Sequence, residues 1–463
     1  MQALTRLRNR LQPTPHDLPE PGLYHYLKTG NGSKVRLHLR VEADGKGLLV
    51  ANASRIYHFN PTAATMAYFA LEEVSNDTAV AVLQRFYDVS RRQAQRDYAD
   101  FCEQFDLIAS PDEVCLACEL DLETTAPFSD RPSAPYRMDL ALTYRCSNDC
   151  HHCYNARSRR HSELETAQWK TILDRLWEIG IPHIVFTGGE PTLRNDLPEL
   201  IAHAEHNGQI TGINTNGRRL KDPIYVQKLV DAGLDHVQIT LESHIAEMHD
   251  QMVAAPGAWR DTTAGIRNAL QTSLFVMTNT TLLASNSPML GDLLTYLTDL
   301  GVPTIGLNAL IYSGHGLNVG SGLPEEQLPP LLEIARRHTA ETDQRLIWYT
   351  PTQYCHFDPV EMSLGVKGCT AALYNMCIEP DGNVIPCQSY YQSLGNLLAQ
   401  PWEAIWNHDL AVSLRERKDI PTACSGCSLL QECGGGCPLA RNALPDIHPV
   451  PIIPTPLWET EVE

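Results

Sequence analysis

Three cysteines in one short segment have the spacing of ligands for an iron–sulfur cluster. Cys146, Cys150 and Cys153 are separated by three and then two residues, directly after an apolar run. Thiolates this close in sequence can converge on one cluster, and three of them leave one iron of a four-iron cubane open to another ligand. A structural zinc site is the alternative, with His151 or His152 as the fourth ligand. The spacing predicts a metal centre in this loop and favours iron–sulfur.

A second polar turn follows the next apolar run. Residues 186–192 read Phe-Thr-Gly-Gly-Glu-Pro-Thr, with Gly188, Gly189 and Glu190 at the centre. Glycines let a backbone approach a ligand closely, and the carboxylate of Glu190 suits an ammonium group. By itself a Gly-Gly turn after a strand is an ordinary turn, so its meaning depends on the cysteine loop. Polar residues also close the next two predicted strands, as in many α/β proteins: Asn214, Thr240 and Glu242.

The segments that must position these loops alternate between strand and helix. Amphipathic helical stretches separate six strand-like runs, at 138–143, 183–187, 211–215, 236–241, 275–282 and 304–310. Such alternation implies parallel strands joined by right-handed crossovers. Six units favour a partial α/β barrel over a closed eight-stranded one.

Four regions are predicted along the 463 residues. Residues 1–108 combine short alternating strands with three helical stretches. Residues 109–135 form a proline-containing connector. The barrel spans 136–343, and residues 344–463 are rich in cysteine, glycine and proline. We expect metal rather than a large apolar core to organise this last region.

The cysteine loop after the first strand, with the Gly-Gly-Glu turn one unit later, resembles the radical S-adenosylmethionine (SAM) superfamily. The resemblance implies that the open iron binds the amino and carboxylate groups of SAM. One electron then yields methionine and a 5′-deoxyadenosyl radical that takes a hydrogen from the substrate, while the protein positions substrate and excludes quenching. The implied SAM contacts are His152, Gly188, Gly189, Glu190, Asn214, Thr240 and Glu242.

Eight of the 14 cysteines lie between residues 355 and 437. The last four have the spacing Cys-x2-Cys-x5-Cys-x3-Cys, and a glycine turn stands between Cys369 and Cys387. Two cysteine pairs can hold one zinc, as in a zinc ribbon, whereas eight thiols suffice for two cubanes. The arrangement resembles the SPASM extension of radical SAM enzymes, which carries auxiliary iron–sulfur clusters. The resemblance assigns Cys369, Cys387 and Cys437 to one of them, with Cys355 as the candidate fourth ligand.

The second auxiliary cluster takes three other cysteines of this region: Cys424, Cys427 and Cys433. No cysteine follows Cys437, which departs from the family's pattern. The cluster must recruit Cys377, use a non-cysteine ligand such as Asp446 or His448, or keep an open iron, and Cys377 is favoured. Cys115 and Cys118 can ligate metal, form a redox pair or be idle thiols, and idle thiols are the default.

Residues 53–108 resemble the small winged-helix domain associated with pyrroloquinoline quinone biosynthesis. The segments that carry the likeness are Phe-Asn-Pro-Thr at 59–62, Tyr-Asp-Val at 87–89 and Asp-Tyr-Ala-Asp-Phe at 97–101. The resemblance implies that this domain binds a precursor peptide, typically as a strand added to a sheet edge. The alternative is a structural or dimerisation domain.

The predicted fold class is therefore α/β: a partial (β/α)6 radical SAM barrel, a winged-helix-like α+β domain and a cysteine-rich SPASM domain. This order resembles peptide-modifying enzymes and implies two partners, a precursor peptide and a small reducing protein of the flavodoxin or ferredoxin type. Sulfatase-maturating relatives have an aspartate base after the hairpin cysteine, where this chain has Gln388, which cannot be a base. The alternatives are radical chemistry on a tetrapyrrole, and a peptide-binding or electron-transfer scaffold that never cleaves SAM.

The composition narrows the possible partners and the compartment. The formal net charge of −19 disfavours nucleic acid and anionic lipid. No run approaches the roughly 20 apolar residues that span a bilayer, and residues 1–10 lack the apolar block of a secretory signal. We therefore predict a cytoplasmic protein whose many cysteines serve as metal ligands.

Overall fold

The computed structural model of the protein describes residues 17–443, apart from 31–32, 53–54, 109–127 and 129–130. The chain divides into two compact units, residues 1–125 with 174–182, and residues 126–173 with 183–463. The domain boundaries expected after residues 108, 135 and 343 stay predictions. Among the described residues, no helix is both long enough and apolar enough to cross a membrane.

The smaller unit starts with an antiparallel sheet in the order β1-β2-β3-β4. Its strands are Gly22–Gly30, Ser33–Val41, Gly47–Ala51 and Arg55–Phe59, and α2 (Pro61–Leu71), α3 (Asn76–Phe86) and α4 (Arg91–Ile108) follow. The Asn60 side chain accepts a hydrogen bond from Ala63 N at 2.8 Å and caps α2. The predicted short strands and three helices are confirmed. Strand β1 was missed, because its apolar residues do not alternate cleanly.

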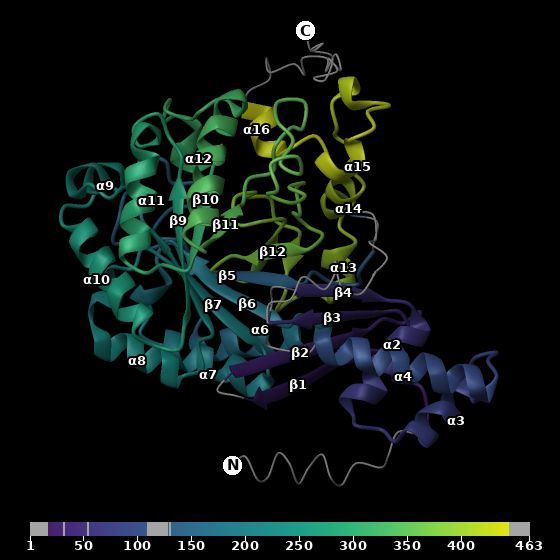
Figure 1. Ribbon diagram of the computed structural model, residues 1–463. Helices are drawn as coiled ribbons and strands as arrows, with labels where there is room; N and C mark the ends of the chain where they lie inside the picture. The colour runs from purple at the N-terminus through teal and green to yellow at the C-terminus, as the bar shows by residue number, and fades with distance from the viewer. Residues whose placement is uncertain (1–16, 31–32, 53–54, 109–127, 129–130, 444–463) are drawn as a thin grey trace. The chain divides into compact units, whose positions relative to one another are not determined.

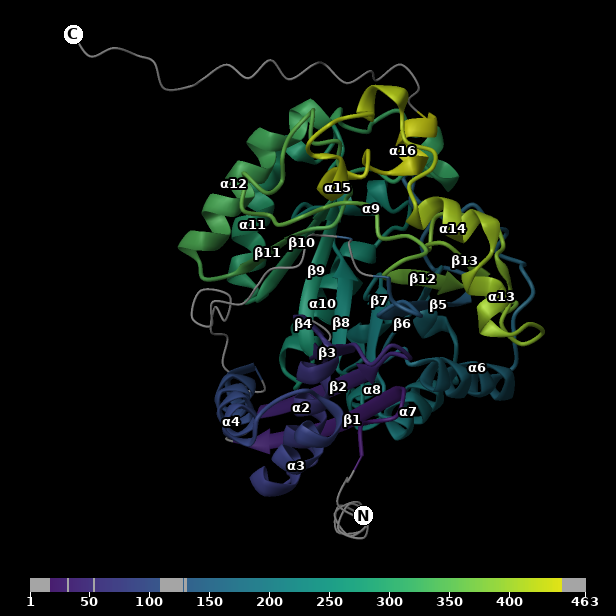
Figure 2. The same cartoon turned by 90° about the vertical axis from the view of Figure 1, so that its right-hand side faces the viewer.

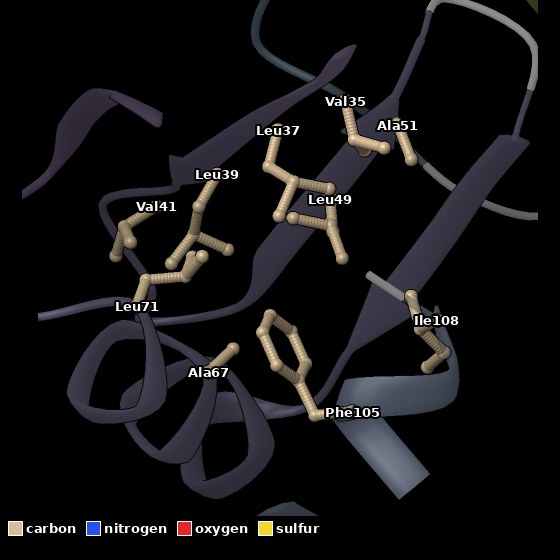
Figure 3. Close-up of a cluster of buried hydrophobic side chains, with 10 residues drawn as sticks. All are labelled: Val35, Leu37, Leu39, Val41, Leu49, Ala51, Ala67, Leu71, Phe105 and Ile108. Atoms are coloured by element: carbon tan, nitrogen blue, oxygen red, sulfur yellow. The ribbon is translucent and has the colours of Figure 1, made fainter. Parts of the chain in front are cut away.

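Alternate residues of β2 enter one apolar core, since successive side chains of a strand point to opposite faces. Val35, Leu37, Leu39 and Val41 pack with residues of β3, α2 and α4 (Figure 3). The sheet ends on β4, which pairs with β3 and has no second strand partner among the described residues. Strands β1 and β4 are therefore the two edge strands of this small sheet in the described part of the chain.

The larger unit contains one sheet in the order β11-β10-β9-β8-β7-β6-β5-β12-β13-β14. Strands β5 to β11 run parallel: Arg137–Thr143, His183–Gly188, Ile210–Thr215, His236–Thr240, Phe275–Thr281, Thr304–Asn308 and Arg345–Trp348. All six predicted strands are present. Strand β11 was not predicted, because its four residues are too few for a clear apolar pattern.

Helices separate these strands as expected for parallel crossovers. They are α6 (Thr166–Ile179), α7 (Leu197–Asn207), α8 (Pro223–Asp231), α9 (Ala246–Met252), α10 (Ala258–Leu270), α11 (Leu290–Asp299) and α12 (Leu328–Glu341). Figure 1 shows α8, α10, α11 and α12 along the outer side of the sheet. The polar ends of the strands are thereby left to build a site inside the curved sheet.

The cysteine-rich region continues the same sheet. Its elements are β12 (Asn375–Ile378), β13 (Asn383–Ile385), β14 (Gly395–Asn396), α13 (Trp402–Trp406), α14 (Asp409–Arg415), α15 (Leu430–Cys433) and α16 (Pro438–Ala443). Strand β12 pairs in parallel with β5 and antiparallel with β13, and α13 and α14 lie beside this hairpin (Figure 2). The longest helix of the region among the described residues has 7 residues, which confirms the expected shortage of regular helix.

A histidine pair crosses the barrel strands near their amino ends. His183 Nε2 and His236 Nε2 are 2.8 Å apart, and a Cβ at Gly212 on the intervening strand would overlap the His236 ring. The hydrogen bond needs one unprotonated Nε2, so two charged imidazoles cannot form it. Burial first, and then the positive charge of Arg137, lowers the pKa of His236 to about 4.

We expect acid to destabilise the fold through this pair. The unfolded chain takes up a proton on residue 236 near its ordinary pKa, while the folded chain does so only near pH 4, so stability falls as the pH drops through this window. The loss is about 2 kcal/mol between about pH 7.5 and pH 5. Urea unfolding of the parent and of His236→Gln at both pH values checks it. Equal losses of stability in both proteins would contradict the assignment.

Candidate functional site

The three cysteines of the predicted cluster loop lie together in the wall of a cavity of about 310 Å³. The end of α9 holds the loop, because Asp149 N donates to Val253 O at 2.9 Å and His151 N donates to Met252 O at 3.1 Å. Asn148 N donates to Cys146 Sγ at 3.4 Å. The loop therefore presents its thiols on a fixed backbone.

Two arginines and an asparagine also hold this loop, a role that the sequence did not indicate. Arg159 donates to the Cys146 and Asn148 carbonyls at 3.0 and 2.6 Å, and Arg218 donates to Ser147 O at 2.8 Å. Asn216 Nδ2 donates to Ser147 Oγ at 3.0 Å and lies 3.9 Å from Cys146 Sγ. Basic and polar residues after strands are common in α/β proteins, so only the fold reveals this role.

The surroundings of the three thiols fit an iron–sulfur cubane. Burial, followed by the charge of Glu190, raises the pKa of Cys146 to about 11. Burial and then Cys153 raise the pKa of Cys150 well above its ordinary value. Neighbouring thiols of this kind ionise together only when a strongly cationic group replaces their protons. Within the described part of the chain, no group of three or more His, Cys, Asp or Glu side chains is arranged to hold a single metal ion.

The glycines of the second turn pack against the cysteine loop. Gly188 has φ +126°, and a Cβ at either Gly188 or Gly189 would overlap backbone atoms of residues 143–145. Gly189 N donates to Thr143 O at 2.7 Å and Glu190 N donates to Arg145 O at 2.9 Å. Both glycines also line the small cavity. The close approach that requires glycine is thus made to the protein's own backbone.

Glu190 does not line this cavity, which differs from the role expected for it. Its side chain is 1% exposed. Oε1 accepts from Thr192 N, Thr192 Oγ1 and Thr215 Oγ1 at 3.1, 2.6 and 2.7 Å, and Oε2 accepts from Asn216 N at 2.8 Å. Burial raises the pKa of Glu190, although these hydrogen bonds oppose the shift. In this structure Glu190 ties β7 to the 3₁₀ turn Pro191–Leu193, and its role as an ammonium contact stays a prediction.

His152 and Glu242, predicted separately as SAM contacts, form a buried pair in the cavity wall. His152 Nε2 is 2.9 Å from Glu242 Oε1, and Glu242 Oε2 accepts from Thr281 N at 2.9 Å. Burial opposes the charged imidazole, but the Glu242 carboxylate outweighs it and raises the pKa of His152. Asn214 and Thr240 line the same cavity. The structure therefore brings together every predicted SAM contact except the Glu190 side chain.

A second cavity, of about 730 Å³, is lined by seven cysteines: Cys355, Cys369, Cys387, Cys424, Cys427, Cys433 and Cys437. Cys377 is not in its wall; it is 1% exposed in β12 and packs with Ala141, Tyr144 and Ile385. Cys115, Cys118, Asp446 and His448 lie outside the described residues. The expected role of Cys377 as a cluster ligand is untested, and its position apart from the seven cavity cysteines argues against it.

The seven cysteines form two groups that differ from the expected assignment of Cys355. Tyr354 N donates to Cys433 Sγ at 3.4 Å, which brings residue 355 to Cys433. Burial, then Cys433 and more weakly Cys424, raise the pKa of Cys355 to about 11. Cys369, Cys387 and Cys437 instead influence one another, and burial followed by Cys437 raises the pKa of Cys369 to about 12. The structure thus favours a four-thiol group with Cys355, Cys424, Cys427 and Cys433, and a separate three-thiol group.

We expect the Cys355→Ala and Cys377→Ala variants to differ in iron content. Cys355→Ala removes one thiol of the four-thiol group and should cost up to about four irons per chain. Cys377→Ala removes a buried core atom, so it should keep the parental iron and lose about 1 kcal/mol of stability. Iron and sulfide analysis with Mössbauer spectra of the reconstituted proteins checks this. Iron loss from Cys377→Ala instead would establish Cys377 as a ligand.

The two cavities meet inside the barrel. Both are lined by Asn214, Gln238, Asn308, Ile311 and Gln388. These side chains carry carboxamides or an alkyl group and no titratable function. A substrate in the large cavity can therefore reach the small one across a neutral polar junction.

Comparison with known proteins decides the family. Residues 140–308 match the radical SAM superfamily and residues 369–428 match the SPASM iron-sulfur cluster-binding domain. A PqqA peptide cyclase from Xanthomonas campestris pv. campestris (strain 8004) is 30% identical over 333 residues, covering 67% of this chain and 84% of that protein. The chain belongs to the radical SAM superfamily. This radical SAM enzyme uses SAM and a [4Fe–4S] cluster, and its SPASM domain binds auxiliary iron–sulfur clusters.

Further relatives agree with the fold of this radical SAM enzyme. An Fe-coproporphyrin III synthase from Methanosarcina barkeri (strain Fusaro / DSM 804) is 28% identical, covering 65% of this chain and 83% of that protein. The structure of SuiB from Streptococcus suis bound to precursor peptide SuiA superposes with a TM-score of 0.65 at 15% identity, covering 87% of this chain and 94% of SuiB. The predicted fold class, with its parallel barrel sheet, small antiparallel sheet and cysteine-rich region, is confirmed.

Proposed function

We propose that this radical SAM enzyme modifies a ribosomally made peptide by forming a crosslink, an epimer or a related C–H functionalisation. The observation that carries the proposal is the small antiparallel sheet, whose edge strand β4 has no second strand partner among the described residues. An open edge accepts an extended peptide as an added strand, and main-chain hydrogen bonds supply the affinity. The names of two similar proteins, a peptide cyclase and an enzyme bound to its precursor peptide, support this substrate class.

The larger cavity supports the same proposal. Its volume of about 730 Å³ lies in the range of cavities that enclose sizeable ligands. The cofactors supply the 5′-deoxyadenosyl radical when they are bound. The chain's own task is to hold the reacting residue at the junction of the two cavities and to exclude water there. Gln388 is fixed at that junction because it accepts a hydrogen bond from Tyr154 Oη at 3.2 Å.

We assign the site residues in the same proposal. Cys146, Cys150 and Cys153 hold the cluster that binds SAM. SAM contacts come from the Gly188–Gly189 backbone and from the side chains in the small cavity wall: His152, Asn214, Thr240 and Glu242. The seven cysteines of the large cavity hold the auxiliary clusters. A small flavodoxin- or ferredoxin-type protein supplies the electron.

A charge on the β4 edge should weaken peptide binding. Ile56 on β4 is 40% exposed, and an introduced lysine there opposes strand addition because charges protect sheet edges. We expect Ile56→Lys to bind the precursor peptide about tenfold less tightly. Fluorescence anisotropy with a labelled peptide measures the change. Ile224→Lys on α8, where the isoleucine is 80% exposed, is the matched control and should bind like the parent.

Anaerobic reconstitution with SAM and dithionite tests the proposed function directly. A candidate precursor peptide, sought as a short reading frame beside the gene, is tested as substrate, and mass spectrometry follows its change while 5′-deoxyadenosine is counted. Loss of two hydrogens, or uptake of solvent deuterium, in step with 5′-deoxyadenosine supports the proposal. An unchanged peptide together with turnover of iron coproporphyrin III would replace it by tetrapyrrole chemistry.

A further inference from the structure

Most charged side chains in the wall of the large cavity are already engaged. Glu325 Oε2 lies 2.8 Å from His356 Nδ1 and accepts from Gln353 N at 3.0 Å. Arg441 donates to the carbonyls of Gly435 and Asp419 at 2.8 and 3.1 Å. These groups hold the cysteine-rich region together and are poorly placed to bind a ligand.

Arg137 differs from these residues. It lines the cavity, and part of its guanidinium donates no hydrogen bond to the described residues. Its Nε donates to Asp139 Oδ1 at 2.6 Å, and the described residues supply no other hydrogen-bond acceptor to it. Its side chain is 33% exposed, whereas that of Asp139 is 1% exposed. A guanidinium carries five donors in a planar fork. Both Nη groups are therefore left for a ligand in the cavity.

Arg137 keeps its positive charge in the folded protein. Burial works against it, but the Asp139 carboxylate outweighs burial and raises the pKa of Arg137. Asp139 offsets the single positive charge of the guanidinium through the Nε side and leaves the Nη donors without an acceptor among the described residues. A carboxylate that approaches the Nη edge can accept two parallel hydrogen bonds from them.

Tyr349 supplies a further donor beside Arg137. Its ring fills space left by Gly306, where a Cβ would lie 2.6 Å from Tyr349 Cε2. Its hydroxyl donates to Met277 Sδ at 3.3 Å, and thioether sulfur is a weak acceptor. Tyr349 is 36% exposed and lines the same cavity as Arg137. The hydroxyl would form a stronger hydrogen bond if it donated to a carboxylate oxygen of a ligand instead of to the Met277 sulfur.

The position of Arg137 connects this receptor to the reaction site. Arg137 and Asp139 stand two residues apart on one face of β5 and both line the large cavity. Asn214, Gln238 and Asn308 line both cavities. Their carboxamides can donate to a peptide carbonyl and accept from a peptide N–H. A residue anchored by its carboxylate on Arg137 thus places its backbone neighbours towards the SAM cavity.

We infer that Arg137, assisted by Tyr349, binds a carboxylate of the substrate at the floor of the large cavity. This assignment rests on the proposed peptide-modifying function. The carboxylate is then the side chain of an aspartate or glutamate next to the peptide residue that loses a hydrogen atom. Arg137 is then a specificity-determining residue. The contact selects acidic peptide segments and discriminates against their amide analogues, because an amide offers the two Nη donors only one acceptor oxygen.

Equilibrium dialysis of labelled N-acetylglutamate amide against the holoenzyme with SAM tests the receptor without any precursor peptide. We expect binding at least about tenfold tighter than for N-acetylglutamine amide, since a hydrogen bond between charged groups is stronger than one to a neutral amide. Arg137→Gln should erase this preference, Arg137→Lys should restore part of it, and Tyr349→Phe should reduce it. Arg345→Gln, an exposed arginine that also begins a strand of this sheet, is the matched control. Equal binding of the two probes, or an unchanged preference in Arg137→Gln, would overturn the inference.

A scan of the precursor peptide separates this inference from the proposed function. One Glu→Gln or Asp→Asn replacement should lower kcat/KM about 10- to 100-fold with the parent enzyme and leave it unchanged with Arg137→Gln. Iron content of Arg137→Gln should match that of the parent, which shows that the variant folds and holds its clusters. A modified peptide that tolerates every replacement overturns the carboxylate site alone. Arg137-dependent binding of iron coproporphyrin III, with no peptide modified, overturns the peptide assignment.

Discussion

Replacing Cys146, Cys150 and Cys153 together by alanine will reduce 5′-deoxyadenosine formation to the background of the assay. The three thiols share one cavity wall, and burial raises the pKa of Cys146 and Cys150, so these thiols ionise together only when a strongly cationic group replaces their protons. Without them the electron has no route to the sulfonium of SAM. Iron content should fall by about four per chain, while the auxiliary iron should remain because its seven cysteines line the other cavity.

Cys102→Ala is the matched control for this variant. Cys102 lies in α4 and packs against the core of the smaller unit. Its replacement should leave both iron content and 5′-deoxyadenosine formation as in the parent. A triple variant that keeps the parental iron, or that still cleaves SAM, would contradict the assignment of the cluster loop.

Replacement of Glu190 should destabilise the fold more than any other single change considered. Its two oxygens accept four hydrogen bonds in a buried site. Glu190→Ala leaves the two backbone donors unmatched and opens a cavity, so we expect a loss of about 4 kcal/mol. Glu190→Gln keeps one oxygen but turns an amide N–H₂ towards a donor, at a cost of about 2 kcal/mol.

Denaturant unfolding of the anaerobic protein measures both losses. Glu199→Gln is the control, because Glu199 pairs with Lys170 at 2.7 Å on the surface and is 58% exposed. Its loss should stay within about 0.5 kcal/mol. SAM affinity should fall in both Glu190 variants, since Thr215 and Asn216 line the small cavity. Unchanged stability in Glu190→Ala would show that its hydrogen bonds do not hold these loops.

The sequence predicted those parts of the site that depend on local spacing. Cys146, Cys150 and Cys153 share one loop after a recognisable strand, so their convergence follows from the chain itself. The strands from residue 137 to residue 308 were also predictable, because a buried parallel strand is a nearly continuous apolar run. The sequence does not indicate helix α9, since its seven residues are too few to show a helical period.

Contacts between distant segments could not be predicted. Nothing in the spacing around Cys355 indicates that residues 352–355 meet Cys433, and that contact changes the grouping of the auxiliary cysteines. The Gly-Gly-Glu sequence likewise does not reveal which way the carboxylate of Glu190 points. His152 and Glu242 were each predicted to lie in the site, but their pairing depends on the approach of two loops. Local patterns determine which residues occupy a loop, whereas the fold determines which loops meet.

The parallel pairing of β12 with β5 has a consequence for how the chain acquires its structure. Strand β5 begins the barrel, and its outer edge is completed only by residues 375–378, synthesised much later. Until then the nascent barrel presents an apolar strand with unpaired backbone groups, which can template association with other chains. A chain cut after residue 343 should therefore aggregate rather than yield a free-standing barrel. Correct folding of the barrel therefore depends on the auxiliary-cluster region, because that region supplies the strand that pairs with the outer edge of β5.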